Sequence, residues 1–99
     1  MDKVAPMMPT VEIWISSVLS TVTDGRRTFS ATGTTILDAL ENLFEEFPGL
    51  RVHLFDDSAS LRPHILIFVG DADVRWKDGL STSLSAGDKI TVMQAVSGG

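Results

Sequence analysis

The sequence predicts an α+β domain in which one mixed β-sheet carries a single main helix on one face. Three patterns favour this fold: a hairpin near the start of the chain, one amphipathic helical segment, and several short apolar strands after it. The chain has 99 residues, which is enough for one hydrophobic core and one domain. The sequence shows no internal repeat that would indicate a second unit.

The first predicted element is a β-hairpin that follows a short arm. Residues 1–9 contain two prolines and are expected to form a flexible arm, so the folded domain would span residues 10–96. Residues 11–22 are rich in β-branched side chains and predict a strand. Residues 23–25 read Thr-Asp-Gly, a turn signal, and residues 26–31 predict the return strand.

The middle of the chain carries the clearest periodicity. Apolar side chains recur there at spacings of three and four, which predicts a helix with one apolar face. Thr35 is the expected N-cap, because a threonine followed three positions later by Asp38 resembles a capping box. Pro48 and Gly49 are expected to end the helix. The apolar set is Ile36, Leu37, Leu40, Leu43, Phe44 and Phe47.

The second half of the chain predicts strands separated by turns. Residues 50–55 predict a short strand, and residues 64–69 form a run of β-branched and aromatic side chains that predicts a longer one. A turn at 70–73 leads into a predicted return strand at 74–76. The last predicted strand covers residues 89–96.

An apolar patch is expected on the sheet face that the helix does not cover. Neighbouring residues of a strand point to opposite faces, so a strand that buries alternate residues leaves Leu66 and Phe68 on the open face. The same rule places Met93 of the last strand there. An exposed apolar patch usually marks a partner site, so we expect these three side chains to bind a partner protein. The alternative is that loops or the N-terminal arm cover them.

The composition excludes several classes of function. The chain has no cysteine, which excludes disulfides, thiolate metal sites and cysteine nucleophiles. A net charge of -5 argues against nucleic acid and anionic membranes as partners, and it permits a basic protein partner. His53 and His64 lack carboxylates at ligand spacing, so we expect no metal, no cofactor and no catalytic residues. No targeting or membrane-spanning segment is visible, and a cytoplasmic protein is expected.

The chain ends in Gly98 and Gly99 directly after a predicted strand. Because glycines carry no side chain, such a tail can thread a narrow channel in another protein. The chain resembles the MoaD/ThiS family of ubiquitin-like sulfur carriers in the order of four segments. They are residues 67–75, the Asp-Gly-Leu at 78–80, the Gly-Asp turn and strand at 87–92, and the Gly-Gly end. Within the family, the resemblance is to the CysO-type carrier of cysteine biosynthesis. Gln94 and Ser97 depart from the proline and alanine common in such carriers.

The resemblance implies a ubiquitin-like β-grasp fold and a carrier that is not itself an enzyme. An ATP-dependent adenylating enzyme would convert the Gly99 carboxylate, presented by Gly98, to an acyl adenylate. A sulfur donor would then replace AMP and leave a thiocarboxylate. Residues 97–99 would form a flexible tail, with Ala95, Val96 and Ser97 contacting the partner beside the patch.

The implied partners are the adenylating enzyme and a sulfur-transfer enzyme or sulfur-accepting synthase. The sulfur could serve cysteine synthesis on an activated serine, or it could enter a thio-cofactor or a natural product, because one fold serves many pathways. Three alternatives remain open. The chain could be a ubiquitin-like modifier attached to lysines, the small subunit of a molybdopterin-synthase-like complex, or a plain binding module that uses only the sheet face.

Overall fold

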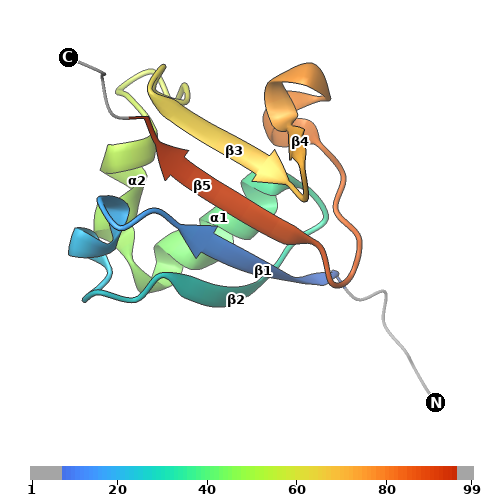
Figure 1. Ribbon diagram of the computed structural model, residues 1–99, viewed down its shortest axis with the longest axis horizontal. Helices are drawn as coiled ribbons and strands as arrows, with labels where there is room; N and C mark the ends of the chain where they lie inside the picture. Colours follow the sequence, from blue (N-terminus) through green and yellow to red (C-terminus); the bar gives the residue numbers. More distant parts are fainter. Residues whose placement is uncertain (1–7, 96–99) are drawn as a thin grey trace.

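The computed structural model describes residues 8–95 and confirms the α+β architecture (Figure 1). A mixed five-stranded sheet has the order β2-β1-β5-β3-β4. Helix α1 crosses one face of this sheet, and a second, shorter helix α2 lies at one end of that face. The strands are β1 (Thr10–Ile15), β2 (Thr28–Thr32), β3 (Ile65–Val69), β4 (Ala72–Asp73) and β5 (Lys89–Gln94). The helices are α1 (Ile36–Glu46) and α2 (Pro48–Leu54).

Strand β5 lies in the middle of the sheet. It pairs in parallel with β1 and antiparallel with β3, while β1 pairs antiparallel with β2. The first four residues of β5, Lys89 to Val92, therefore have β1 on one side, and β3 pairs with β5 on the other side from Ile90 to Gln94. Of the predicted arm and tail, residues 1–7 and 96–99 lie outside the described residues.

The main helix follows its predicted pattern with one exception. The Thr35 hydroxyl accepts a hydrogen bond from the Asp38 backbone N–H at 3.2 Å, which confirms the predicted N-cap. Ile36 and Leu40 are fully buried against the sheet. Leu37 was predicted on the apolar face, but its side chain is 38% exposed. Leu37 lies outside the buried apolar stripe of the helix, and such a stripe covers on the order of 100° around the helix axis.

The predicted strand at residues 50–55 is wrong, because helix α2 occupies this segment. Pro48 does end α1, yet it also starts α2, since a proline at the first helical turn loses no hydrogen bond. Leu50 and Leu54 are four residues apart and fully buried, which is helical spacing. Phe55 makes only an isolated bridge to Leu61.

Two other predicted strand segments are 3₁₀ turns. The first strand ends at Ile15, and the residues that follow form a turn at Leu19–Val22, where Leu19 packs into the core. Local hydrogen bonds from the Ser20 and Thr21 hydroxyls to carbonyls three residues earlier compete there with strand pairing. The return strand predicted at residues 74–76 is likewise a turn, Val74–Trp76, and the strand that returns along β3 on this side is the two-residue β4.

A third 3₁₀ turn, Gly79–Ser81, completes the long connection between β4 and β5. None of the helices among the described residues has the length and apolar character that crossing a membrane requires. The core thus lies between α1, α2 and the covered face of the sheet. Within residues 8–95, no helix or strand layer covers the opposite face of β1, β3 and β5 (Figure 1).

Candidate docking face and C-terminal site

The open face of the sheet is built by strict alternation along its three central strands. In β1, Ile13 is fully buried while its neighbour Trp14 is 37% exposed. In β5, Val92 is fully buried while Met93 is 42% exposed. The strand register then places open-face residues from different strands side by side. One row across the sheet is Trp14, Thr91 and Phe68, and the next is Met93 and Leu66.

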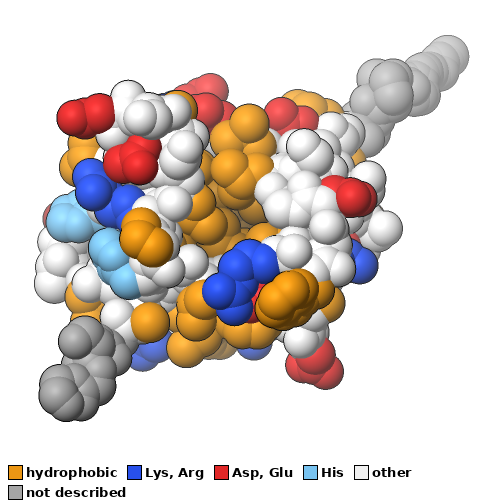
Figure 2. Space-filling view, turned by 90° about the horizontal axis from the view of Figure 1, so that it is seen from above, with side chains coloured by type: hydrophobic (Ala, Val, Ile, Leu, Met, Phe, Trp, Pro, Cys, Tyr) orange, Lys and Arg blue, Asp and Glu red, His pale blue; other side chains and the backbone are white. Residues whose placement is uncertain are grey.

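The three residues predicted to form the apolar patch do share this face. Leu66 and Phe68 are half-buried, and Leu66 lies directly opposite Met93 across the β3–β5 ladder. Figure 2 shows hydrophobic side chains gathered in a band across the side of the molecule on which β3 and β4 lie, with basic side chains beside it. Partner binding by Leu66, Phe68 and Met93 remains a prediction.

Trp14 is a central member of this face that the sequence reasoning missed. The signal was present, because alternation of Val11, Ile13 and Ile15 toward the core puts Trp14 on the other side. The Lys89 ammonium nitrogen lies 4.3 Å from the centroid of the Trp14 ring, a cation–π contact. A hollow of about 170 Å³ adjoins the ring; its lining includes Trp14, Ser16, Arg27, Lys89, Thr91 and Met93.

The carboxyl end of β5 is anchored on both sides. The backbone N–H of Ala95 donates to the His64 carbonyl oxygen at 2.7 Å, and that of Gln94 donates to the Ser16 hydroxyl oxygen at 3.4 Å. Ala95 is exposed and is the last described residue. Val96, Ser97, Gly98 and Gly99 lie outside the described residues. An extended chain spans at most about 3.6 Å per residue, so any four residues can reach no further than about 14 Å.

These features place a half-buried apolar face and an anchored strand end next to each other. A partner bound to the open face could therefore also contact the residues that follow Ala95 in the chain. Comparisons with known proteins identify the family of this chain. The model of the ThiS family matches residues 17–99. The chain belongs to the ThiS family.

Two relatives give this family match more detail. The sulfur carrier protein CysO of Mycobacterium tuberculosis is 34% identical over 91 residues, covering 90% of this chain and 98% of the relative. The small archaeal modifier protein 3 of Haloferax volcanii is 34% identical over 65 residues, covering 66% of this chain and 70% of the relative. The ThiS-family chain thus resembles both a carrier and a modifier.

The fold has a solved counterpart in a crystal structure of an Amycolatopsis orientalis BexX/CysO complex. The TM-score is 0.83 at 31% identity, covering 90% of this chain and 99% of the other. The predicted ubiquitin-like β-grasp fold of this ThiS-family chain is thereby confirmed.

A rigid charged turn borders the open face at β4. Asp73 lies opposite Phe68 in the register, and its carboxylate accepts hydrogen bonds from the backbone N–H of Arg75 at 2.9 Å and from the Arg75 guanidinium Nη2 at 2.7 Å. The Arg75 side chain, by these hydrogen bonds, holds the pKa of the Asp73 carboxyl below its ordinary value, and Asp73 raises the pKa of Arg75. The neighbouring Trp76 is exposed.

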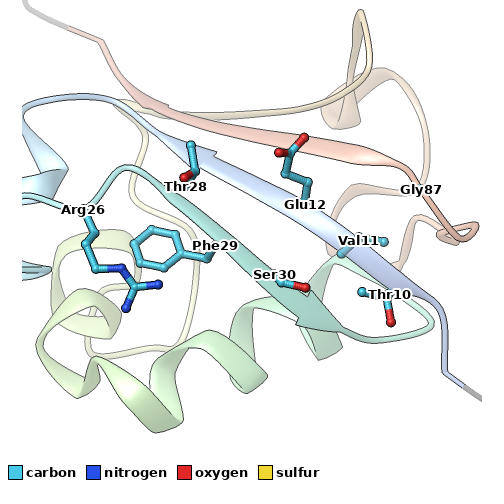
Figure 3. A pocket seen from close by; sticks show the side chains of 8 residues that line it. All are labelled: Thr10, Val11, Glu12, Arg26, Thr28, Phe29, Ser30 and Gly87. Atoms are coloured by element: carbon cyan, nitrogen blue, oxygen red, sulfur yellow. The ribbon is translucent and has the colours of Figure 1, made fainter.

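A larger hollow, about 510 Å³, lies elsewhere, along the outer edge of β2. Figure 3 shows that Arg26 and Phe29 point from this edge toward the helices, whereas Glu12 and Thr28 lie on the other side of the strands. The hollow thus wraps around a strand instead of enclosing a ligand. Its lining includes Gly87, before β5, and no residue of the anchored end of β5, so we do not assign the site to it.

No group of three or more His, Asp or Glu side chains that could hold a metal occurs within residues 8–95. His53 lies in α2, and His64 contributes only its backbone carbonyl to the contact with Ala95. The described part of the site consists of the open sheet face and the hydrogen-bonded end of β5.

Proposed function

We propose that this protein is a sulfur carrier whose C-terminal carboxylate, on Gly99, is converted to a thiocarboxylate. The observation that carries the proposal is the family match, which runs through residue 99 and includes both terminal glycines. The identity to the sulfur carrier protein CysO over nearly the whole relative supports the same function.

The proposed chemistry has two steps. The Gly99 carboxylate attacks the α-phosphate of ATP in an adenylating enzyme, and pyrophosphate leaves. Hydrosulfide then attacks the acyl carbon, and AMP leaves with the bonding electron pair, so that the products are AMP, a thiocarboxylate and one proton. Adenylation is needed because a carboxylate is a poor electrophile. The thiocarboxylate then donates its sulfur in a biosynthetic pathway, which makes cysteine, a thio-cofactor or a natural product.

The carrier contributes a handle and a docking face to this chemistry, while the partner supplies the catalytic groups. Strand β5 is fixed at its end by the His64 carbonyl and the Ser16 hydroxyl, so the residues after Ala95 start from a defined point. Residues 97–99 would act as a flexible tail that enters the active site of the adenylating enzyme and later that of a sulfur-transfer enzyme or synthase. Because activation consumes ATP, we place the carrier in the cytoplasm.

A second candidate function is that of a ubiquitin-like modifier. It is favoured by the 34% identity to the small archaeal modifier protein 3. The modifier route would begin with the same acyl adenylate, but the acceptor would be the amine of a lysine on another protein. The two functions therefore differ only after activation, and an experiment must examine the fate of the terminal acyl group.

The test is intact mass spectrometry of untagged protein from its own host, before and after a thiol-alkylating reagent. Mass alone is ambiguous, because exchange of oxygen for sulfur adds nearly the same mass as oxidation of one of the four methionines. Alkylation resolves this, since the chain has no cysteine. The matched control is the chain lacking Gly98 and Gly99.

A single alkyl adduct that maps to Gly99, and is absent from the shortened control, is the expected result. If there is no adduct even with the host's adenylating enzyme, ATP and sulfide, the carrier function is wrong. Recovery of Gly99 in isopeptide bonds to lysines of other proteins would instead support the modifier function.

A further inference from the structure

The charges of this protein are not distributed as its net charge suggests. The chain carries a formal charge of -5, and four exposed or half-buried acidic side chains lie on helix α1. They are Asp38, Glu41, Glu45 and Glu46. The open face around Trp14 instead carries two exposed cations, Arg27 and Lys89.

These two cations line the same small hollow. Lys89 extends from the start of β5 over the Trp14 ring, and the Arg27 Nε–H donates to the carbonyl oxygen of Ile15 at 3.1 Å. Both side chains are therefore held by contacts that leave charged N–H groups available. An anion placed in the hollow would meet a preorganised site, which binds at a lower entropic cost than flexible side chains would.

Neither cation forms an ion pair within 4.0 Å among residues 8–95. The ion pairs among residues 8–95 are Arg26 with Glu46, Arg51 with Glu41, and Arg75 with Asp73. Glu12 lies on the same face and opposite Lys89 in the register, but it forms no ion pair within 4.0 Å in that part of the chain. Glu12 lines the hollow at the edge of β2 and is not among the residues lining the one beside Trp14.

We propose that Arg27 and Lys89 bind a carboxylate of the adenylating enzyme, which therefore presents an acidic surface to the open face. This inference rests on the proposed carrier function and specifies the chemistry of its partner. It reverses the expectation of a basic partner that follows from the net charge alone. The apolar neighbours, Trp14 and Met93, would lie against apolar side chains of the same partner surface.

The position of the hollow explains why a contact there would matter. Ser16 lines the hollow and also accepts the hydrogen bond from the Gln94 backbone, so the hollow adjoins the anchored end of β5. An ion pair at this point would fix how the carrier is rotated on its partner. The four residues after Ala95 can span at most about 14 Å, so this rotation would decide where the terminal carboxylate can reach.

The experiment is ATP–pyrophosphate exchange catalysed by the host's adenylating enzyme, with the full chain as the varied substrate. Lys89→Met keeps much of the stem but removes the charge, and Lys89→Arg keeps both the charge and a cation–π contact. We expect Lys89→Met to raise the KM for the carrier about tenfold with kcat nearly unchanged, and Lys89→Arg to stay close to the wild type. Circular dichroism and thermal unfolding verify that each variant is folded.

Two further variants test the sign of the effect. Glu12→Gln removes a negative charge from the open face and should lower the KM of an acidic partner. The double variant Glu41→Gln and Glu45→Gln removes two charges from α1 and should leave KM within about twofold, since docking would not involve that side. Added salt should raise the wild-type KM more steeply than that of Lys89→Met.

The results separate this inference from the proposed function. Exchange by the wild type with an unchanged KM for Lys89→Met would overturn the acidic-partner inference and leave the carrier function standing. The same holds if the variants alter only self-association in sedimentation, which would assign the cations to contacts between copies. Absence of exchange by the wild type would instead remove the carrier function, and this inference with it.

Discussion

Strand β5 faces two different environments along its length. Val92 is fully buried beneath α1, whereas Met93, one residue later, is 42% exposed on the open face. The covered side is needed to fold the domain, and the open side is apolar beyond what folding requires. The difference indicates that substitutions on the covered side should lower the stability of the domain. Substitutions on the open side should impair the proposed activation of this protein by the adenylating enzyme.

The two sides of the molecule also differ in charge. Helix α1 turns acidic side chains to solvent, and the open face holds Arg27 and Lys89 around Trp14. Net charge averages these surfaces and hides the basic character of the face that we propose as the docking surface. Four substitutions test this difference between the two sides.

The largest expected effect on stability is that of Leu40→Ala. Leu40 is fully buried beneath the sheet, and truncation of a buried leucine costs about 2–5 kcal/mol of unfolding free energy. Leu37→Ala on the same helix is the matched control and should cost under about 1 kcal/mol, because Leu37 is partly exposed. Urea unfolding measures both. Equal losses would contradict the assignment of the two sides.

The largest expected effect on activation is that of Trp14→Ala. Buried aromatic anchors of interfaces contribute at least about 2 kcal/mol, so kcat/KM in pyrophosphate exchange should fall at least about thirtyfold. Val52→Ala, an exposed apolar side chain on α2, is the control and should have no such effect. Similar activities for the two variants would show that the open face does not dock the enzyme.

A smaller effect is expected for Thr35→Ala. The Thr35 hydroxyl caps α1 by accepting from the Asp38 N–H, and loss of such a cap costs about 1 kcal/mol. Thr35→Ser retains the hydroxyl and should keep most of the stability. Since the cap lies on the covered side, activation by the adenylating enzyme should be the same for all three proteins.

The smallest expected effect is the pH dependence given by Asp73. Its folded pKa is held below the ordinary value of 3.8, so its stabilisation is fully present above that pH and is lost as the pH falls through the folded pKa. Thermal unfolding of the wild type and Asp73→Asn should therefore differ slightly at neutral pH and converge in acid. A difference that persists unchanged below pH 3.8 would show that the carboxylate charge is not responsible.

Elements with strong local signals could be predicted from the sequence. The cap and periodicity of α1 were sufficient to place that helix, and alternation in the later strands was sufficient to place Leu66, Phe68 and Met93 on one face. Helix α2 was missed because a proline ends one helix and can begin another. Leu50 of α2 is buried by tertiary packing, which the intrinsic secondary-structure preferences of residues 50–55 do not indicate.

The charged hollow could not be predicted either. Arg27 and Lys89 are 62 positions apart in the sequence, since 89 minus 27 is 62, and only the parallel pairing of β1 with β5 brings Lys89 to Trp14. Long-range pairing of this kind leaves no periodic signal in either segment. The alternation that places Trp14 on the open face, by contrast, is visible within β1 itself.

The most direct test of the division between the two faces is an NMR titration of the labelled protein with the host's adenylating enzyme. We predict that signals from Trp14, Phe68 and Met93 shift or broaden at low enzyme concentration, while those of Glu41 and Glu45 on α1 stay unchanged. Perturbation confined to the α1 residues would contradict the account, because it would place the docking surface on the acidic side of the molecule.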